Sequence, residues 1–455
     1  MTGIATPAEL QEFLQRYPDI DAVQIFLTDP GGVTRGKIVR RHELARIFDS
    51  GRNVAGSILG LDVTGTDVDA TGLVWDTGDA DMVCRPVAGT LTPLNWLPAP
   101  TAQLMLTMFT NGGEPASADP RHALARAVAR LEGLGYTPVL ACEIEFYLLH
   151  PETLQPAGGG RASERNKIDA YSLTRLDDLA PLFADVYRAA AEQGLPAETL
   201  MSEYAPGQFE ITLTHRADAL RAVDEAILFK RLLRGVAARH GLIASFMAKP
   251  FAERAGSGLH LHLSLASRAA GTPGENLCAA PDPAGSALLR HMIGGLKATM
   301  AESFAVFAPN ANSYRRFQAA SYAPVAPIWG INNRSVSLRV PSGPPQSRHV
   351  EHRVAGADAN LYLAAATVLA AAEKGCREQL DPGPPVEGNG YALKLAREFP
   401  ATWHEALERA ARSDFLAQAL GRETRDIFLA IKQQECARFS AQVTELDYAW
   451  YLRSV

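Results

Sequence analysis

The chain has few cysteines, and none of them is spaced to form a zinc site or a disulfide framework. The five cysteines, at positions 84, 142, 278, 376 and 436, are odd in number and include no Cys-x-x-Cys pair. Cys142 lies between apolar neighbours in a strand-like run, where a buried and unreactive thiol is expected. We therefore predict reduced thiols without a structural or nucleophilic role.

Long apolar runs and clusters of basic residues are also missing. The longest strongly apolar stretch, residues 361–372, is shorter than the roughly 20 residues that a membrane-spanning helix needs, and no charged and then apolar leader begins the sequence. Lys and Arg number 44 against 50 Asp and Glu, which gives a formal net charge of −6. Without a Lys/Arg run for a polyanion, we expect no nucleic-acid partner, no membrane partner and a cytoplasmic location.

A Walker-type loop, Gly-x-x-x-x-Gly-Lys-[Ser/Thr], is absent as well, which excludes an ordinary P-loop nucleotide site. What the chain does have is size and a normal core composition. Its 455 residues are 47% hydrophobic, enough for two or three domains with a substantial core.

The pattern of elements predicts an α+β fold in two domains. Residues 22–28 and 37–40 flank an Asp-Pro-Gly-Gly turn and predict a hairpin, and short strands with many Gly and Pro residues continue to about residue 105. Asp119-Pro120 is a signal for the start of a helix, and from there the pattern changes to longer helices and strands. Helices are expected near 177–193 and 218–240, with several hairpin-linked strands. We place the domains at 1–112 and 113–455 and expect a mobile surface loop near 158–167.

The segment Glu203 to Glu210 reads Glu-Tyr-Ala-Pro-Gly-Gln-Phe-Glu and places two carboxylates around a turn. Its Pro-Gly pair is a turn signal, and the alternation that follows predicts a strand, which would hold Glu210 on a rigid element. A metal ion between the two carboxylates would explain the arrangement. Glutamates on a hairpin are more often solvated, so the segment alone does not decide the matter.

Two further strands each carry a pair of polar residues on one face. Side chains alternate along a strand, so Glu143 and Glu145 share a face, as do His260 and His262 beside Gly-Ser-Gly. A solvated strand face explains the glutamates equally well, but adjacent carboxylates repel each other unless a cation relieves them.

Together with Glu351 these residues form a ligand set that consists mostly of oxygen atoms, and such a set suits Mg²⁺ or Mn²⁺ better than Zn²⁺. Two ions would fit it, as in sites that bridge a triphosphate. Phosphoryl transfer also needs cationic groups, and the chain offers Arg315, Arg316, Arg334, Arg339 and Arg353. A surface ion pair is still the commoner role of any one arginine.

Several motifs in one order resemble the glutamine synthetase family over nearly the whole chain, and most closely its γ-glutamylpolyamine (glutamate–putrescine) synthetase branch. The motifs are Arg35-Gly-Lys, Glu143-Ile-Glu, Glu203 to Glu210, Lys249-Pro, Gly256-Ser-Gly-Leu-His-Leu-His, Asn312-Ser-Tyr-Arg-Arg-Phe, Asn333-Arg and Glu351-His-Arg-Val-Ala-Gly-Ala-Asp-Ala-Asn. The resemblance implies a small N-terminal β-grasp domain, a larger catalytic domain with an antiparallel sheet and flanking helices, and a ring-shaped homo-oligomer, a decamer or dodecamer.

The resemblance also implies roles for individual residues, with ATP and two or more Mg²⁺ or Mn²⁺ ions at each site. One metal would be held by Glu145, Glu203 and Glu210, and the other by Glu143, His260 and Glu351. The substrate glutamate would be seated by Gly256, Arg316 and Arg353. The nucleotide and its phosphates would be contacted by His262, Ser264, Arg334 and Arg339. The groups expected to act directly in the reaction are Arg334, Arg316 and Glu203, the last as a candidate base.

Departures from the family pattern bear on the second substrate. Ammonia-using members carry two acidic residues where this chain has Val54 and Tyr322, which leaves a less polar pocket, although Asp62, Asp67 or Asp69 could restore a charge. Ala255 replaces a common Asn beside the substrate glutamate, and residues 380–385 lack the tyrosine that adenylylated members carry. We expect ATP-dependent ligation of a primary amine, a polyamine or a monoamine, to glutamate. The alternatives are a glutamine synthetase that uses ammonium and a non-catalytic relative.

Overall fold

The computed structural model describes residues 3–158, 168–269, 272–393 and 398–455. The loop expected near 158–167 therefore lies almost entirely outside the described residues. The chain builds two sheets, one of six strands near the N-terminus and one of nine strands in the remainder. The predicted α+β class is confirmed.

The N-terminal sheet is mixed and has the order β2-β1-β6-β4-β3, with β5 paired to β6. The predicted hairpin is present, because β1 and β2 are antiparallel neighbours, whereas β1 and β6 run parallel. The strands are β1 (Ala22–Thr28), β2 (Thr34–Arg40), β3 (Arg52–Ala55), β4 (Asp81–Pro86), β5 (Thr92–Pro93) and β6 (Thr101–Phe109). Two helices, α1 (Pro7–Arg16) and α2 (Leu44–Ser50), contribute Leu10, Phe13, Leu44 and Ile47 to its core.

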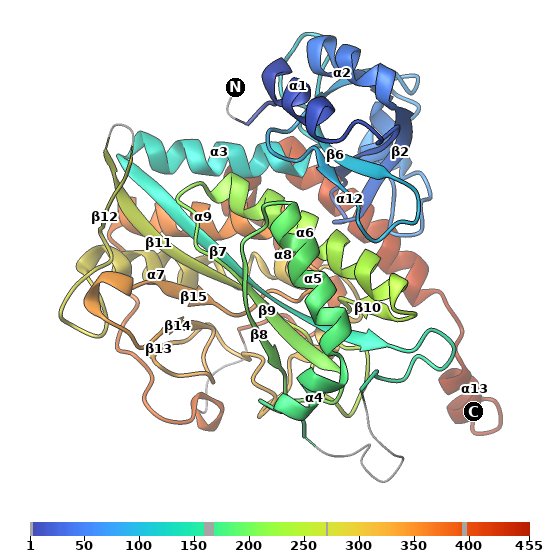
Figure 1. The fold of residues 1–455 in the computed structure, drawn as a ribbon. Helices are drawn as coiled ribbons and strands as arrows, with labels where there is room; N and C mark the ends of the chain where they lie inside the picture. Colours follow the sequence, from blue (N-terminus) through green and yellow to red (C-terminus); the bar gives the residue numbers. More distant parts are fainter. Residues whose placement is uncertain (1–2, 159–167, 270–271, 394–397) are drawn as a thin grey trace.

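A late segment of the chain closes this small core. Ile427 and Ile431 of α12 (Arg422–Ser440) belong to the same apolar cluster as the N-terminal strands, and Figure 1 shows α12 running up against the N-terminal region. The two predicted domains are therefore packed together through the C-terminal part. The boundary at residue 112 stays a prediction.

The large sheet has the order β13-β14-β15-β11-β7-β9-β8, with β10 on β7 and β12 on β11. It is antiparallel as expected, except for the parallel pair β13 and β14. Its strands are β7 (Tyr136–Leu149), β8 (Ala197–Ser202), β9 (Gln208–Leu213), β10 (Ile243–Ser245), β11 (Leu259–Ala269), β12 (Thr272–Asn276), β13 (Trp329–Ile331), β14 (Leu338–Val340) and β15 (Val350–His352).

Helices flank this sheet and cover its apolar face. The helices that contact the sheet include α3 (Pro120–Gly133), α6 (Ala219–Arg239) and α7 (Ala287–Thr299), and α9 (Leu361–Glu378) packs on α3 and α7 (Figure 1). The others are α4 (Leu173–Asp178), α5 (Ala180–Glu192), α8 (Phe304–Phe307), α10 (Trp403–Arg412), α11 (Asp414–Leu420) and α13 (Glu445–Tyr451). Because β7 buries Leu140, Ile144 and Phe146 in this layer, its glutamates point to the opposite face.

Two helix predictions can be compared directly with the structure. The helix expected at 218–240 is α6, and the Asp218 side chain caps it by accepting from the backbone N–H of Arg221 at 3.0 Å. The helix expected near 177–193 is α5, which begins three residues later than expected, at Ala180, and ends at Glu192. The chain turns at Leu179, where φ and ψ leave the helical region, and Pro181 begins α5 anew because proline is favoured in a first helical turn.

Among the described residues, no helix combines the length and hydropathy needed to cross a bilayer.

Candidate active site

The register of three neighbouring strands brings the predicted acidic residues together. Glu145 of β7 lies opposite Glu210 of β9, and Glu143 of β7 lies opposite His260 of β11. These cross-strand positions place side chains on one face within contact distance. The pattern of alternation therefore predicted the correct face of both strands, and the pairing of strands supplies the cluster.

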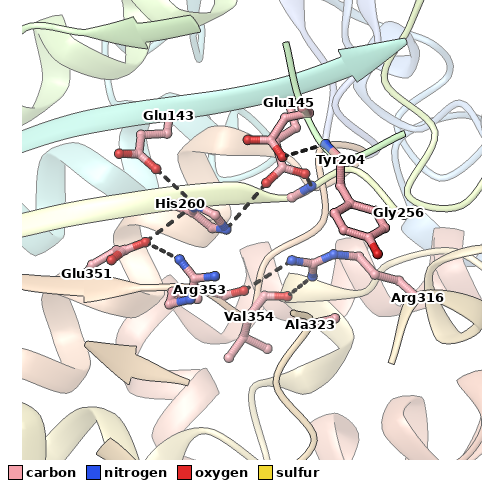
Figure 2. A network of polar contacts seen from close by, with 12 residues as sticks. Glu143, Glu145, Tyr204, Gly256, His260, Arg316, Ala323, Glu351, Arg353 and Val354 are labelled. Atoms are coloured by element: carbon pink, nitrogen blue, oxygen red, sulfur yellow. Dashed lines mark hydrogen bonds and ion pairs between the residues drawn. The ribbon is translucent and has the colours of Figure 1, made fainter. Parts of the chain in front are cut away.

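His260 lies at the centre of this cluster (Figure 2). Its Nδ1 is 2.9 Å from Oε2 of Glu143 and 3.5 Å from Oε1 of Glu351, and its Nε2 is 3.7 Å from Oε1 of Glu145. Ligand atoms lie within 4.8 Å of one another in two groups that share His260, one with Glu143 and Glu351 and one with Glu145 and Glu210. Glu203 belongs to neither group.

Glu203 instead lines a cavity of about 290 Å³ beside the cluster. It lies in the turn between β8 and β9, where its Oε2 accepts a hydrogen bond from the backbone N–H of Tyr204 at 3.1 Å. Of the predicted site residues, the same cavity is lined by Glu145, Glu203, Glu210, Gly256, His260, Arg316, Arg334 and Arg353. Carboxylates and arginines therefore face one enclosed space.

Two of the carboxylates that line the cavity have raised pKa values. Burial and then the nearby Glu145 raise the pKa of Glu203 to about 7, against the lowering effects of the Tyr204 backbone N–H and of Arg334. Burial and then Glu143 and Glu145 raise the pKa of Glu210 well above its usual value. A cation in this cluster would relieve that repulsion, and carboxylate oxygens with one imidazole are the donor set that suits Mg²⁺ or Mn²⁺.

Glu351 is already held by two arginines. Burial works to raise its pKa, but the guanidinium of Arg353 lowers it to about 2. Arg353 donates to Oε1 of Glu351, and Arg339 donates to its Oε2 at 2.8 Å. Arg339 thus contacts a predicted metal ligand and does not line the cavity, so its predicted contact with phosphate stays a prediction.

Arg316 is fixed by backbone carbonyls. It is buried and donates to the oxygens of Val354 at 2.8 Å and of Arg353 at 3.2 Å (Figure 2). A Cβ at Gly256 would lie 2.5 Å from the Ala248 oxygen and 2.9 Å from Cγ of Arg316, so only glycine fits this approach. By contrast, Arg334 is exposed at the cavity wall and makes no hydrogen bond or ion pair with the described residues.

The predicted nucleotide residues on β11 lie further along the strand. His262 is buried, with its Nε2 2.9 Å from Oε1 of Glu143. Ser264 is buried two residues beyond. Neither lines the cavity, and their predicted roles are not tested by this arrangement. Val54 lies on β3 opposite Met82, away from the cavity, so its predicted part in amine selection also stays a prediction.

Sequence reasoning missed several residues of the cavity. Gln208 donates to Glu145 at 3.3 Å and to the Gly256 oxygen at 3.0 Å, which ties the two segments together. Its position two residues before Glu210 on one strand was the available signal. The exposed rings of Tyr171 and Tyr204 also line the cavity. Tyr322, which the sequence already indicated, lines the same cavity, and its ring centroid lies 6.3 Å from that of Tyr204.

Comparison with known proteins gives a consistent result. The family model for the glutamine synthetase catalytic domain matches residues 117–451. The chain belongs to the glutamine synthetase family. It is 37% identical to the γ-glutamylputrescine synthetase of Escherichia coli K12 over 99% of this chain and 96% of that one. It is 32% identical to the glutamate–isopropylamine ligase of a Pseudomonas species over 98% of this chain and 97% of that one.

A solved structure titled GmaS/ADP complex superimposes with a TM-score of 0.84 at 28% identity, covering 97% of this chain and 99% of that one. The predicted family and its fold are thereby confirmed. Membership implies use of ATP and a divalent metal, and the oxygen-rich donor groups around His260 fit such an ion.

Magnesium affinity is expected to fall as the pH is lowered. The pKa of Glu203 is raised to about 7 and that of Glu210 well above its usual value. If these carboxylates bind the metal as predicted, protons would occupy their oxygens at lower pH and compete with it. Each displaced proton weakens binding by up to about 10-fold per pH unit. Calorimetric titration near pH 8 and pH 6 measures the change, and Glu203→Gln should flatten it. A Kd that is the same at both pH values would contradict this prediction.

Proposed function

We propose that the protein joins a primary alkyl amine to the γ-carboxylate of glutamate at the expense of ATP, by way of γ-glutamyl phosphate. The observation that carries the proposal is the composition of the single cavity described above. Its lining combines three carboxylates and His260 with three arginines, Arg316, Arg334 and Arg353, and with three tyrosines.

We assign the divalent ions to the two sets that the resemblance implies, Glu145 with Glu203 and Glu210, and Glu143 with His260 and Glu351. When bound, such ions neutralise phosphate oxygens and orient the transferring group. In the free protein Gly258 N–H donates to Oε2 of Glu145 at 2.7 Å, which fixes that carboxylate. Fixed carboxylates of this kind support a preformed metal site.

The substrate glutamate is assigned to the wall formed by Gly256, Arg316 and Arg353. The guanidinium of Arg316 is held by two carbonyls and its orientation is therefore fixed, which suits recognition of a carboxylate. Buried Arg353 has an Nε without a partner among the described residues. Held in this way, the γ-carboxylate of glutamate would attack the terminal phosphorus of ATP, and the exposed Arg334 would stabilise charge on the transferring oxygens.

The amine must lose a proton before it attacks the acyl phosphate, since an alkylammonium with a pKa of ~10 is a poor nucleophile at neutral pH. Glu203 is the base we propose. Its carboxylate lines the same cavity as Tyr204 and Tyr322, where the amine would bind, and would accept the proton there.

An alkyl amine rather than ammonium is favoured by the wall around Tyr322. Tyr204 and Tyr322 both line the cavity, and ammonium-using members of the family would carry an acidic residue at the position of Tyr322. Aromatic faces accept alkyl chains and attract a distal ammonium. A glutamine synthetase that uses ammonium is the first alternative. A non-catalytic relative is the second, and it would have no need of the full set of carboxylates and arginines.

Product analysis tests the reaction directly. The protein is incubated with glutamate, ATP, Mg²⁺ and putrescine, and mass spectrometry should find the γ-glutamylamide with one ADP formed for each product. Replacing the amine by hydroxylamine should yield γ-glutamyl hydroxamate, because hydroxylamine traps an acyl phosphate. ATP hydrolysis without either product would exclude the ligase.

Tyr322→Glu is expected to shift selectivity toward ammonium. A carboxylate at this wall attracts a small cation and disfavours an alkyl chain, so the ratio of kcat/KM for ammonium to that for an alkyl amine should rise about 10-fold. Tyr322 has a φ of 58°, which is as unfavourable for glutamate as for tyrosine, so the substitution adds no backbone strain. Tyr171→Glu, at another tyrosine of the same cavity, is the comparison. An unchanged ratio in Tyr322→Glu would remove this residue from the amine site.

We further propose a ring-shaped homo-oligomer of ten or twelve subunits, a boundary between a β-grasp domain and a catalytic domain near residue 112, and a cytoplasmic location. These proposals rest on the family resemblance. Mass photometry of the purified protein tests the first, since a ring would give a single peak at ten or twelve times 48.9 kDa. A monomer or dimer at all concentrations would contradict it.

A further inference from the structure

Three histidines from distant segments meet beside the carboxylate cluster. His262 comes from β11, His215 from the loop after β9, and His349 from the residue before β15. One ring nitrogen of each lies within 4.8 Å of the others, and the ring centroids of the three pairs are 5.9, 5.3 and 5.1 Å apart. Such convergence of three imidazoles is not required by packing, since His215 is exposed.

Two of the rings are oriented by bonds to their outer nitrogens. Nδ1 of His349 lies 2.7 Å from the Ser347 oxygen and can only donate to it, so its Nε2 keeps a lone pair. Nε2 of His262 lies 2.9 Å from a carboxylate oxygen of Glu143, which leaves Nδ1 as the inner atom. That Nδ1 lies 2.9 Å from Nε2 of His349 and donates a hydrogen bond to it, so a metal ion bound there would replace this proton. A metal-bound histidine usually donates its other N–H to a carboxylate or carbonyl in this manner.

The third ring lies on a loop whose base is fixed. Arg216, the next residue, pairs through its backbone with Leu140 and donates to both carboxylate oxygens of Glu225, at 3.0 and 3.1 Å. The His215 side chain itself has no hydrogen bond among those described and can rotate. Tetrahedral coordination at ~2.0–2.1 Å places ligand nitrogens ~3.3 Å apart. The His262 and His349 nitrogens, 2.9 Å apart, would therefore separate slightly, and rotation of His215 would bring its nitrogen to the same ion.

We propose that His215, His262 and His349 form a binding site for a borderline transition-metal ion of the Zn²⁺ class, separate from the carboxylate sites for magnesium. Three neutral imidazoles and one open position to solvent are a ligand set that selects Zn²⁺, Cu²⁺ or Ni²⁺ over Mg²⁺. The outer nitrogen of His262 is in contact with Glu143, a carboxylate that we assign to magnesium. An ion bound at the three histidines therefore holds Glu143 as a hydrogen-bond acceptor and alters the environment of the magnesium site beside it.

Cobalt provides a probe that is independent of ligase activity. The full-length protein is first supplied with excess Mg²⁺ to fill the carboxylates, and Co²⁺ is then added while its visible absorption is followed. We expect one equivalent to bind with the intense bands of a tetrahedral nitrogen site, and Zn²⁺ to displace it. No binding in the presence of Mg²⁺, or the weak spectrum of an octahedral oxygen site, would overturn the proposal.

Variants locate the ion. His215→Ala and His349→Ala should each weaken Co²⁺ and Zn²⁺ binding by at least about 10-fold, while His404→Ala, an exposed histidine on α10, should leave it unchanged. His215→Ala removes an exposed side chain and keeps the fold testable if His349→Ala does not express. Equal affinity in the wild-type protein and in His215→Ala would also overturn the proposal. Inhibition by Zn²⁺ that is relieved in His215→Ala would add the link to the proposed ligase reaction, whereas the binding result stands without it.

Discussion

Glu145→Gln is expected to lower kcat by at least about 100-fold. The change keeps the size of the side chain but removes the negative charge of Glu145, which lies opposite Glu210 and next to His260. If this carboxylate holds a divalent ion, the amide loses most of that affinity and the electrostatic stabilisation of the transferring phosphoryl group. Steady-state ADP release at saturating glutamate, ATP and amine measures the effect.

Thermal unfolding of the same variant separates a metal role from a structural one. Without metal, Glu145→Gln should melt at the same or a higher temperature than the wild type, because it relieves the repulsion that raises the pKa of Glu203 and Glu210. The rise in Tm on adding Mg²⁺ should shrink. Glu198→Gln, an exposed glutamate on β8 of the same sheet, is the matched control. A variant that keeps full activity and its full response to Mg²⁺ would refute the metal assignment.

Arg334→Ala is expected to reduce kcat by ~10³-fold with little change in stability. The side chain is exposed at the cavity wall and has no hydrogen bond or ion pair among the described residues, so its loss breaks no contact in the fold. An arginine that meets the transferring phosphoryl group contributes ~10³–10⁵ in rate in other phosphoryl-transfer enzymes. The rate of ADP release and the Tm are measured for Arg334→Ala and for the wild-type protein.

Arg315→Ala provides the comparison for this prediction. Arg315 is likewise exposed, and its Nη1 donates only to the Ala311 oxygen, at 3.1 Å, among the described contacts. It is not among the residues that line the cavity. We expect near wild-type turnover from it. If both arginine variants lose activity equally, the loss reflects the change in surface charge, and Arg334 has no specific role in phosphoryl transfer.

The faces of the site strands could be predicted from the sequence because side chains alternate along a strand. That period placed Glu143 and Glu145 together, and it placed His260 and His262 together. The register between strands could not be predicted, since many pairings satisfy the same alternation. The contact of Glu145 with Glu210 and of Glu143 with His260 therefore came only from the structure.

Polar contacts between residues far apart in the sequence could not be predicted either. Nothing near Arg339 in the sequence indicates that it donates to Glu351 across β14 and β15 rather than lining the cavity. The meeting of His215, His262 and His349 depends on two loops and a strand, each fixed by its own neighbours. The start of α5 was placed three residues too early because the apolar spacing continues across Leu179, where the backbone leaves the helical region.

The central claim is that an alkyl amine, and not ammonium, is the nucleophile. The most direct test is the rate of ADP release with glutamate, ATP and Mg²⁺, comparing ammonium with putrescine, spermidine and simple monoamines at equal concentration. The account predicts that kcat/KM for at least one amine exceeds that for ammonium by more than about 100-fold, a difference that burial of an alkyl chain of a few methylenes can supply. Turnover with ammonium that equals or exceeds that with every amine would contradict it and make the protein a glutamine synthetase.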